Sequence, residues 1–256
     1  MSFAAEYLTT DGFLDGRLQI LQPKSGYRAA TDPVYLAAAV PAKTGQSVLE
    51  LGCGAGVALA CLCYRVRGLD GFGLEIQRNY ADLARTNLIQ NQLSAQIVTG
   101  DLLNMPDSLK AKSFDHVLAN PPFFKVSAHT APTDKGRATG RLEGAALATD
   151  WVDASLTRLK PGGWMTMIHR AEMLAEILAA IGSRAGDIRI LPIAARQNRM
   201  ARRVIVQARK GAAGVLTLMA PLIVHSGAEH GADGDDYADV TRGILRDVHP
   251  LVMTSR

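Results

Sequence analysis

Three closely spaced glycines follow a short apolar run, and this feature constrains the fold more than any other. The segment from Glu50 to Gly56 reads Glu-Leu-Gly-Cys-Gly-Ala-Gly, between a run typical of a buried strand at residues 47–51 and a helical pattern at 54–63. Glycine lacks a Cβ and tolerates positive φ, so this loop lets the backbone approach a ligand closely where a helix begins. The alternative is a loop that only turns a strand into a helix.

Apolar runs alternate with helical patterns along the chain, which predicts a mostly parallel sheet with helices on both faces. Besides 47–51, strands are expected at residues 68–75, 96–99, 114–119, 164–169, 188–193 and 204–208, and helices at 78–92, 142–159 and 171–181. A turn is expected at 161–163, a long loop at 125–140 and a further strand at 216–225. The expected fold class is Rossmann-like α/β with a seven-stranded sheet. Residues 1–40 are expected to form an N-terminal extension or lid, and 41–256 a single domain.

An acidic residue follows the second expected strand in the place where nucleotide sites use one. Glu75 ends that strand, where a carboxylate can accept hydrogen bonds from both ribose hydroxyls. Loop and acid together indicate an adenosine-containing cofactor. A dinucleotide is the main competitor, but its fingerprint requires a small residue at Val57 and includes no acid at Glu50.

The order acid-x-Gly-x-Gly-x-Gly resembles the first motif of class I S-adenosylmethionine-dependent methyltransferases. The resemblance implies a Rossmann-like methyltransferase fold with S-adenosylmethionine as cofactor. It implies that Glu75 holds the ribose and that Asp101, after the third expected strand, contacts the adenine amine. The full expected cofactor set adds the loop residues and the neighbours of both acids: Glu50, Gly52, Cys53, Gly54, Gly56, Ile76 and Leu102.

The tetrapeptide Asn120-Pro121-Pro122-Phe123 ends the fourth expected strand, since two prolines cannot continue a hydrogen-bonded ladder. It therefore belongs at the edge of the sheet where ligands bind in open α/β folds. A simple strand terminator is the alternative. The tetrapeptide resembles the motif of methyltransferases that act on nitrogens conjugated to a π-system, which implies that all four residues are catalytic and that Asn120 also contacts the cofactor. Hydrogen bonds to the Asn120 side-chain oxygen and the Pro121 carbonyl would favour the pyramidal, nucleophilic amine, and Phe123 would stack on a base.

The chain before the first expected strand extends the resemblance to one group of these enzymes. Residues 22–32 read Gln-Pro-Lys-Ser-Gly-Tyr-Arg-Ala-Ala-Thr-Asp, ahead of an Ala- and Leu-rich helix at 34–40. This is similar to tRNA adenine-N6 methyltransferases that modify the adenine beside the anticodon of a valine tRNA. The similarity implies a tRNA partner and places Thr31 and Asp32 near the amino-acid part of the cofactor. Asp32 ahead of Pro33 fits a helix N-cap equally well. The Gly-, Asp- and Ala-rich stretch 227–236 departs from that family.

Positive charge gathers late in the sequence, within a modest net charge of +4. The Arg-rich segment 196–203 fits an RNA partner, although a solvated charged face is as good an interpretation. Five residues of the long loop are candidate substrate contacts: Lys125, His129, Lys135, Arg137 and Arg141. The motifs leave other acceptors open, namely a glutamine amide of a protein factor, a guanine N2 of rRNA or a small-molecule hydroxyl. A non-catalytic RNA-binding or cofactor-sensing protein is also open.

The cysteines, the apolar runs and the first residues of the chain indicate the cellular compartment that we expect. The three cysteines fit neither a disulfide framework nor a zinc pattern, and the histidines show no metal-ligand spacing. No apolar stretch reaches the length of a membrane span, and the first residues lack the basic start and apolar run of a secretory signal. We expect a cytoplasmic protein without metal or membrane partner, as a monomer or homodimer.

Overall fold

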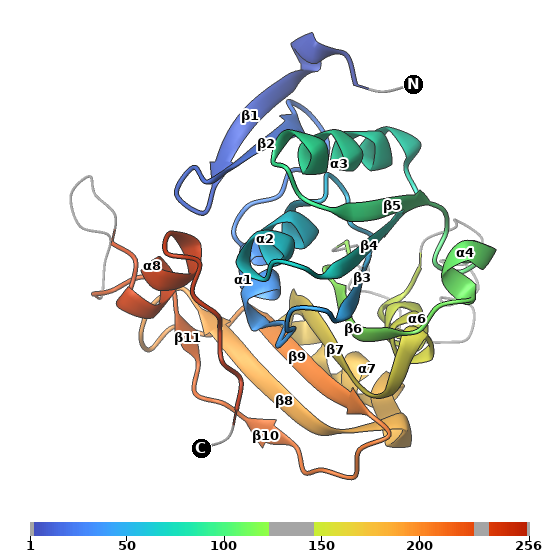
Figure 1. Ribbon diagram of the computed structural model, residues 1–256. Helices are drawn as coiled ribbons and strands as arrows, with labels where there is room; N and C mark the ends of the chain where they lie inside the picture. Colours follow the sequence, from blue (N-terminus) through green and yellow to red (C-terminus); the bar gives the residue numbers. More distant parts are fainter. Residues whose placement is uncertain (1–2, 123–145, 228–235, 255–256) are drawn as a thin grey trace, which may run out of the picture.

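A single twisted sheet of nine strands forms the centre of the computed structural model, which describes residues 3–122, 146–227 and 236–254 (Figure 1). Its order is β10-β8-β9-β7-β6-β3-β4-β5, with β11 paired to β8. All pairs are parallel except those of β9, which is antiparallel to both neighbours. The strands are β3 (Ser47–Leu51), β4 (Asp70–Glu75), β5 (Ala95–Thr99), β6 (Phe114–Ala119), β7 (Leu159–Arg170), β8 (Ala185–Ala194), β9 (Arg203–Lys210), β10 (Thr217–Leu218) and β11 (Leu222–Ile223).

Helices cover both faces of the sheet, which confirms the expected α/β class (Figure 1). One apolar cluster packs the first three helices and β2 against the sheet, and a second packs α6 and α7 against the other face. Because both faces are covered, the strands read as continuous apolar runs in the sequence. The helices are α1 (Asp32–Ala39), α2 (Val57–Arg65), α3 (Arg78–Gln90), α4 (Asp107–Lys110), α6 (Ala148–Arg158), α7 (Leu174–Ile181) and α8 (Asp239–Leu245). No helix in the described ranges is long and apolar enough to cross a membrane.

The first forty residues contain two distinct parts. Strands β1 (Leu8–Phe13) and β2 (Leu18–Pro23) form an antiparallel hairpin that projects from the sheet beside α3 (Figure 1). Its inner side chains Leu18 and Ile20 are fully buried in the core. Helix α1, in contrast, is buried from Pro33 to its last residue and packs against α2. The hairpin is thus an added layer, whereas α1 lies inside the core.

Several element bounds differ from the sequence expectation for identifiable reasons. Helix α2 begins at Val57 rather than at residue 54, because Gly54 and Gly56 adopt positive φ. The turn expected at 161–163 is part of β7, whose pairing with β6 shifts register near its start. The strand expected at 216–225 is two short strands on β8, with Pro221, which has no N–H to donate, between them. These two edge strands bring the expected seven strands to nine.

Asn87 of α3 joins the hairpin to the glycine-rich loop through a fully buried side chain. Its Oδ1 accepts the Leu21 N–H at 2.8 Å, and its Nδ2 donates to the carbonyls of Leu21 at 3.0 Å and Ala55 at 2.9 Å. Asn87→Ala should lower the free energy of unfolding by about 2–3 kcal/mol, because it strands buried backbone groups. Asn91→Ala, whose side chain meets the exposed backbone of Gln19, should cost less than about 1 kcal/mol. Equal losses in urea unfolding would contradict this bridging role.

Candidate active site at the switch point of the sheet

The order of strands reverses between β3 and β6, and both predicted motifs leave the sheet at this point. From β3 the chain moves outward through β4 and β5, and then returns to β6 on the other side of β3. Leu51 of β3 pairs in register with Ala119 of β6, so Gly52 and Asn120 leave neighbouring strands at the same level. Ligands of open α/β sheets bind at such a switch point, outside the carboxyl ends of the strands.

The three glycines of the loop all lie in the left-handed region, with φ of 63° at Gly52, 55° at Gly54 and 81° at Gly56. A Cβ on Gly52 would lie 2.4 Å from the Trp151 ring, which shows that this turn is packed tightly from α6. A Cβ on Gly54 would meet only the ring of Tyr27, at 3.6 Å. The loop therefore has one packed side and one side on which its backbone approaches Tyr27.

Two buried carboxylates fix the shape of this loop. Glu50 Oε2 accepts the Leu59 N–H at 2.8 Å and so ties the end of β3 to α2. Burial, with a contribution from Glu75, raises the pKa of Glu50 well above its usual range. Glu75 Oε2 accepts the Gly54 N–H at 2.9 Å, and its Oε1 accepts the Gln77 N–H at 2.8 Å. Glu75 is thus held against the glycine loop at the carboxyl end of β4.

The predicted cofactor residues Glu75, Ile76, Asp101 and Leu102 lie at or just beyond the ends of β4 and β5. Ile76, directly after Glu75, leaves 57% of its surface exposed, which is unusual for an apolar residue beside a buried strand end. Asp101 lies two residues past β5 and accepts the Leu103 N–H through Oδ1 at 2.9 Å, with Oδ2 in no described hydrogen bond. Leu102, directly after Asp101, is half-buried. Two carboxylates and two apolar side chains thus follow the carboxyl ends of the neighbouring strands β4 and β5.

Asn120 is half-buried at the end of β6, followed by a buried Pro121 and an exposed Pro122. Its Nδ2 donates a hydrogen bond to the hydroxyl oxygen of Tyr27 at 3.4 Å. Phe123 and the loop residues Lys125, His129, Lys135, Arg137 and Arg141 lie outside the described residues.

Tyr27 is the site residue that sequence reasoning missed. Its hydroxyl meets Asn120 and its ring lies against Gly54, so it links the two motifs. Tyr27 leaves 51% of its surface exposed, but desolvation of its hydroxyl, with the charges of Glu50 and Asp32, raises the pKa of Tyr27 to about 12. The sequence does contain one indication: Tyr27 is the one aromatic residue in the stretch 22–32, which resembles the family's N-terminal motif.

Thr31 and Asp32 lie at the start of α1 and face a different part of the same edge. Thr31 is the N-cap residue, and Asp32 pairs with Arg203 of β9, Oδ2 to Nε at 3.0 Å, instead of capping the helix. Both line a groove of about 800 Å³ whose other wall is the connection from β8 to β9. That connection is the Arg-rich segment, so the groove carries Arg196, Arg199, Arg202 and Arg203.

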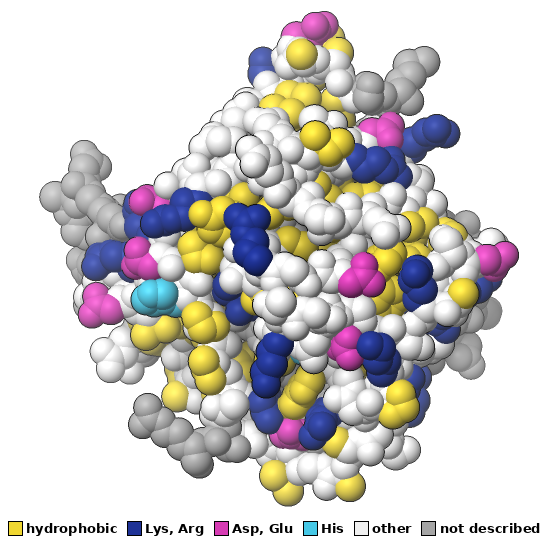
Figure 2. Space-filling model, viewed as in Figure 1, with side chains coloured by type: hydrophobic (Ala, Val, Ile, Leu, Met, Phe, Trp, Pro, Cys, Tyr) yellow, Lys and Arg dark blue, Asp and Glu magenta, His cyan; other side chains and the backbone are white. Residues whose placement is uncertain are grey.

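The charges of this groove are unequally compensated. Arg196 pairs with Asp236 and Arg203 with Asp32. Arg199 and Arg202 are exposed, and no ion pair of either occurs among the residues that the structure describes. Met200 between them is 84% exposed. Figure 2 shows basic and acidic side chains interspersed over the described part of the face in view.

Comparisons with known proteins agree with this geometry. A family model of the methyltransferase small domain matches residues 32–180. A tRNA1(Val) (adenine(37)-N6)-methyltransferase of Porphyromonas gingivalis is 29% identical over 199 residues, which cover 72% of this chain and 77% of the relative. An enzyme of the same name from Trichodesmium erythraeum is 25% identical over 182 residues, covering 68% and 75%.

Solved structures show the same fold. A predicted O-methyltransferase from Agrobacterium tumefaciens matches with a TM-score of 0.70 at 25% identity, covering 86% of this chain and 98% of that one. A T. thermophilus 16S rRNA methyltransferase in complex with AdoMet and guanosine matches with a TM-score of 0.52 at 19% identity, covering 79% and 50%. The family match spans more than half of the chain and includes the glycine loop, Glu75 and Asn120, so this protein belongs to the methyltransferase small-domain family and is an S-adenosylmethionine-dependent methyltransferase.

Proposed function

We propose that this enzyme methylates the N6 amine of an adenine in tRNA. The observation that carries the proposal is the position of Asn120, whose amide nitrogen points to Tyr27 from the strand next to the glycine loop. The Asn120 side-chain oxygen is then the group available to a planar amine. The names of the two relatives above support adenine N6 and tRNA as the acceptor.

The residues proposed to hold S-adenosylmethionine come from the ends of four strands, β3, β4, β5 and β6, and from the start of α1. When bound, the cofactor supplies an electrophilic methyl group. Glu75 would bind the ribose hydroxyls, Asp101 the adenine amine, and Ile76 with Leu102 the faces of the ring. The backbone of the glycine loop, shaped by Glu50, would lie along the rest of the cofactor, with Cys53 as part of the packed loop. The proposed set also includes the α1 residues Thr31 and Asp32, and Asn120.

The acceptor amine is a poor nucleophile because its lone pair is delocalised into the purine ring. Asn120 Oδ1 and the Pro121 carbonyl would accept its two N–H groups, which favours a pyramidal nitrogen with an available lone pair. The two prolines fix the direction of that carbonyl, since their φ angles are restricted. Phe123 is proposed to stack on the base. Alkylation makes the nitrogen acidic, so it can lose its proton to water without a dedicated base.

The Arg-rich groove offers a path for the RNA backbone beside this site. It lies at the carboxyl edge of the sheet, where Asn120 also lies. Arg199 and Arg202 are exposed there, and neither forms an ion pair within the described residues. Replacing both by alanine should lower the slope of log affinity for tRNA against log salt by about 1–2, because each phosphate contact releases counterions. The double variant Arg67→Ala with Arg184→Ala removes the same charge at the opposite edge and should keep the wild-type slope. Equal slopes in all three proteins would contradict a groove that binds RNA.

A glutamine amide of a protein factor is the second candidate acceptor, because the same two hydrogen bonds fit a planar amide. Incubation with methyl-labelled cofactor and separate tRNA, rRNA and protein fractions of the source cell distinguishes the two. We expect label in tRNA, released by ribonuclease. Label that resists ribonuclease and is released by protease would instead support the glutamine acceptor.

A further inference from the structure

We propose that Tyr27 is a positioning residue for methyl transfer, which orients the amide of Asn120 so that its oxygen faces the acceptor amine. The proposal rests on the function proposed above. Its starting point is the hydrogen bond from Asn120 Nδ2 to the Tyr27 hydroxyl oxygen. An asparagine amide is almost symmetric in shape, and either of its ends can face a ligand. A partner that engages the nitrogen leaves the oxygen for the substrate.

The orientation of this amide decides whether Asn120 can accept a hydrogen bond from the acceptor amine. With the oxygen forward, it accepts an amine N–H and enriches the lone pair on the nitrogen. With the nitrogen forward, two donors would face another donor, and the acceptor would lose that hydrogen bond. A tyrosine hydroxyl can accept a hydrogen bond from an amide nitrogen or donate one to an amide oxygen, and in this structure it accepts from Asn120 Nδ2 at 3.4 Å. In that arrangement the amide oxygen is the end left for the acceptor amine.

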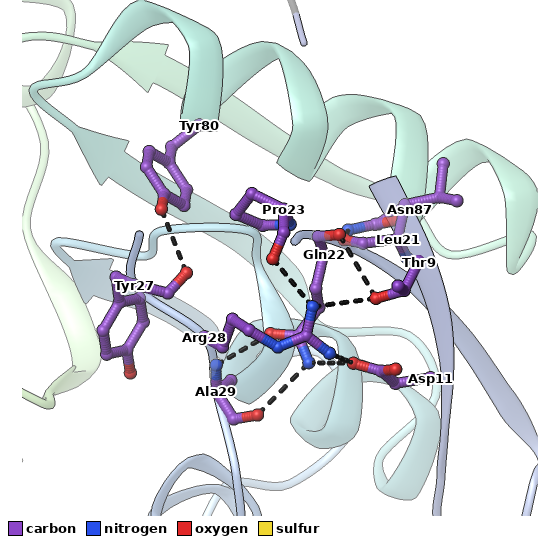
Figure 3. A network of polar contacts seen from close by, with 10 residues as sticks. All are labelled: Thr9, Asp11, Leu21, Gln22, Pro23, Tyr27, Arg28, Ala29, Tyr80 and Asn87. Carbon is purple, nitrogen blue, oxygen red and sulfur yellow. Dashed lines mark hydrogen bonds and ion pairs between the residues drawn. The ribbon is translucent and has the colours of Figure 1, made fainter. Parts of the chain in front are cut away.

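The backbone of Tyr27 is held in place from the core. Tyr80 of α3 donates its hydroxyl hydrogen to the Tyr27 carbonyl at 3.0 Å (Figure 3). Gly26 has φ of 104°, and a Cβ there would lie 3.0 Å from the same Tyr80 hydroxyl. The positive φ favours glycine before Tyr27, and the Tyr80 hydrogen bond ties the Tyr27 backbone to α3.

The N-terminal hairpin holds the residues that follow Tyr27. Arg28 donates to the Pro23 carbonyl at 2.7 Å and pairs with Asp11 of β1 at 2.6 Å (Figure 3). The buried Gln22 of β2 brackets Ala29, accepting its N–H at 2.7 Å and donating to its carbonyl at 3.2 Å. Gln22 also donates to Asp11 at 2.6 Å, which joins the two contacts into one network. The hairpin therefore anchors the segment that carries Tyr27, which gives this added layer a role in the reaction.

Tyr27→Phe removes the hydroxyl and keeps the ring against Gly54, so it isolates the contact with Asn120. We expect kcat to fall about five- to tenfold, with KM for the cofactor and for tRNA within twofold of wild type. In an Asn120→Ala background, measured under single turnover with excess enzyme, Tyr27→Phe should change the rate by less than twofold. Tyr7→Phe, an exposed tyrosine just before the hairpin, is the matched control and should leave all constants unchanged.

Three results would overturn the proposal: wild-type kcat in Tyr27→Phe, a rise confined to the KM for the cofactor, or the same rate loss with and without Asn120. The last two would make Tyr27 a cofactor contact independent of Asn120. A failure of the proposed function is recognised separately, because Asn120→Ala would then keep its activity or the product would not be N6-methyladenosine. Thermal unfolding of Tyr27→Phe should match wild type, since the aromatic ring is retained.

Discussion

Asn120→Ala is expected to lower kcat for methyl transfer by about 10²–10³-fold, while the affinity for S-adenosylmethionine changes by less than about threefold. The Asn120 oxygen acts on hydrogen bonds that strengthen as the amine becomes pyramidal, so its loss affects the transition state more than binding. Rapid-quench kinetics with labelled cofactor measures kcat, and calorimetry measures the affinity.

Two further variants make this result specific. Asn120→Asp keeps an acceptor oxygen for the amine, and the Tyr27 hydroxyl can donate to its carboxylate, so it should keep more activity than Asn120→Ala. Asn91→Ala, at the end of α3 that is farther from the strand ends carrying the motifs, is the matched control and should keep the wild-type kcat. An Asn120→Ala enzyme with near wild-type kcat would contradict the mechanism.

Glu75→Gln is expected to weaken S-adenosylmethionine binding by about 10–100-fold. A hydrogen bond to a charged group contributes about 1.5–3 kcal/mol, and the glutamine nitrogen would also face the N–H of Gly54 or Gln77. The loop should therefore distort, so the variant is also expected to unfold at a lower temperature. Calorimetric titration with the cofactor and thermal unfolding measure the two effects.

Asp101→Asn separates binding from loop stability. Its carboxylate meets only the exposed Leu103 N–H among the described contacts, so the melting temperature should stay unchanged. Cofactor affinity should still fall by about three- to tenfold, since the expected contact is with the adenine amine. If Glu75→Gln and Asp101→Asn both bind the cofactor as tightly as wild type, the cofactor site lies elsewhere.

The sequence predicted the strands that carry both motifs, and the structure confirms residues 47–51 and 114–119 with the same bounds. Both are apolar runs with a sharp local end, a glycine loop in one case and two prolines in the other. The two motifs lie side by side because β3 and β6 pair in register. That pairing follows from the order of strands in the sheet, which the local sequence pattern does not reveal. The helix expected from residue 54 begins only at Val57, because Gly54 and Gly56 adopt positive φ.

Tyr27 and the charges of the groove could not be predicted from local sequence. Tyr27 meets Asn120 across 93 positions of the chain, through a loop whose path depends on the hairpin. Arg203 and Arg196 find their acidic partners 171 and 40 positions away. A composition argument counts all four arginines of the segment alike, whereas folding compensates two of them and leaves Arg199 and Arg202 exposed.

Nucleoside analysis of tRNA treated with the purified enzyme tests the central claim most directly. Unmodified tRNA transcripts, incubated with deuterated-methyl cofactor and digested to nucleosides, should yield N6-methyladenosine with the heavy methyl group by mass spectrometry. Asn120→Ala should reduce that product by about 10²–10³-fold under the same conditions. Heavy methyl found instead in 1-methyladenosine or N2-methylguanosine, or in no tRNA nucleoside at all, would contradict the account.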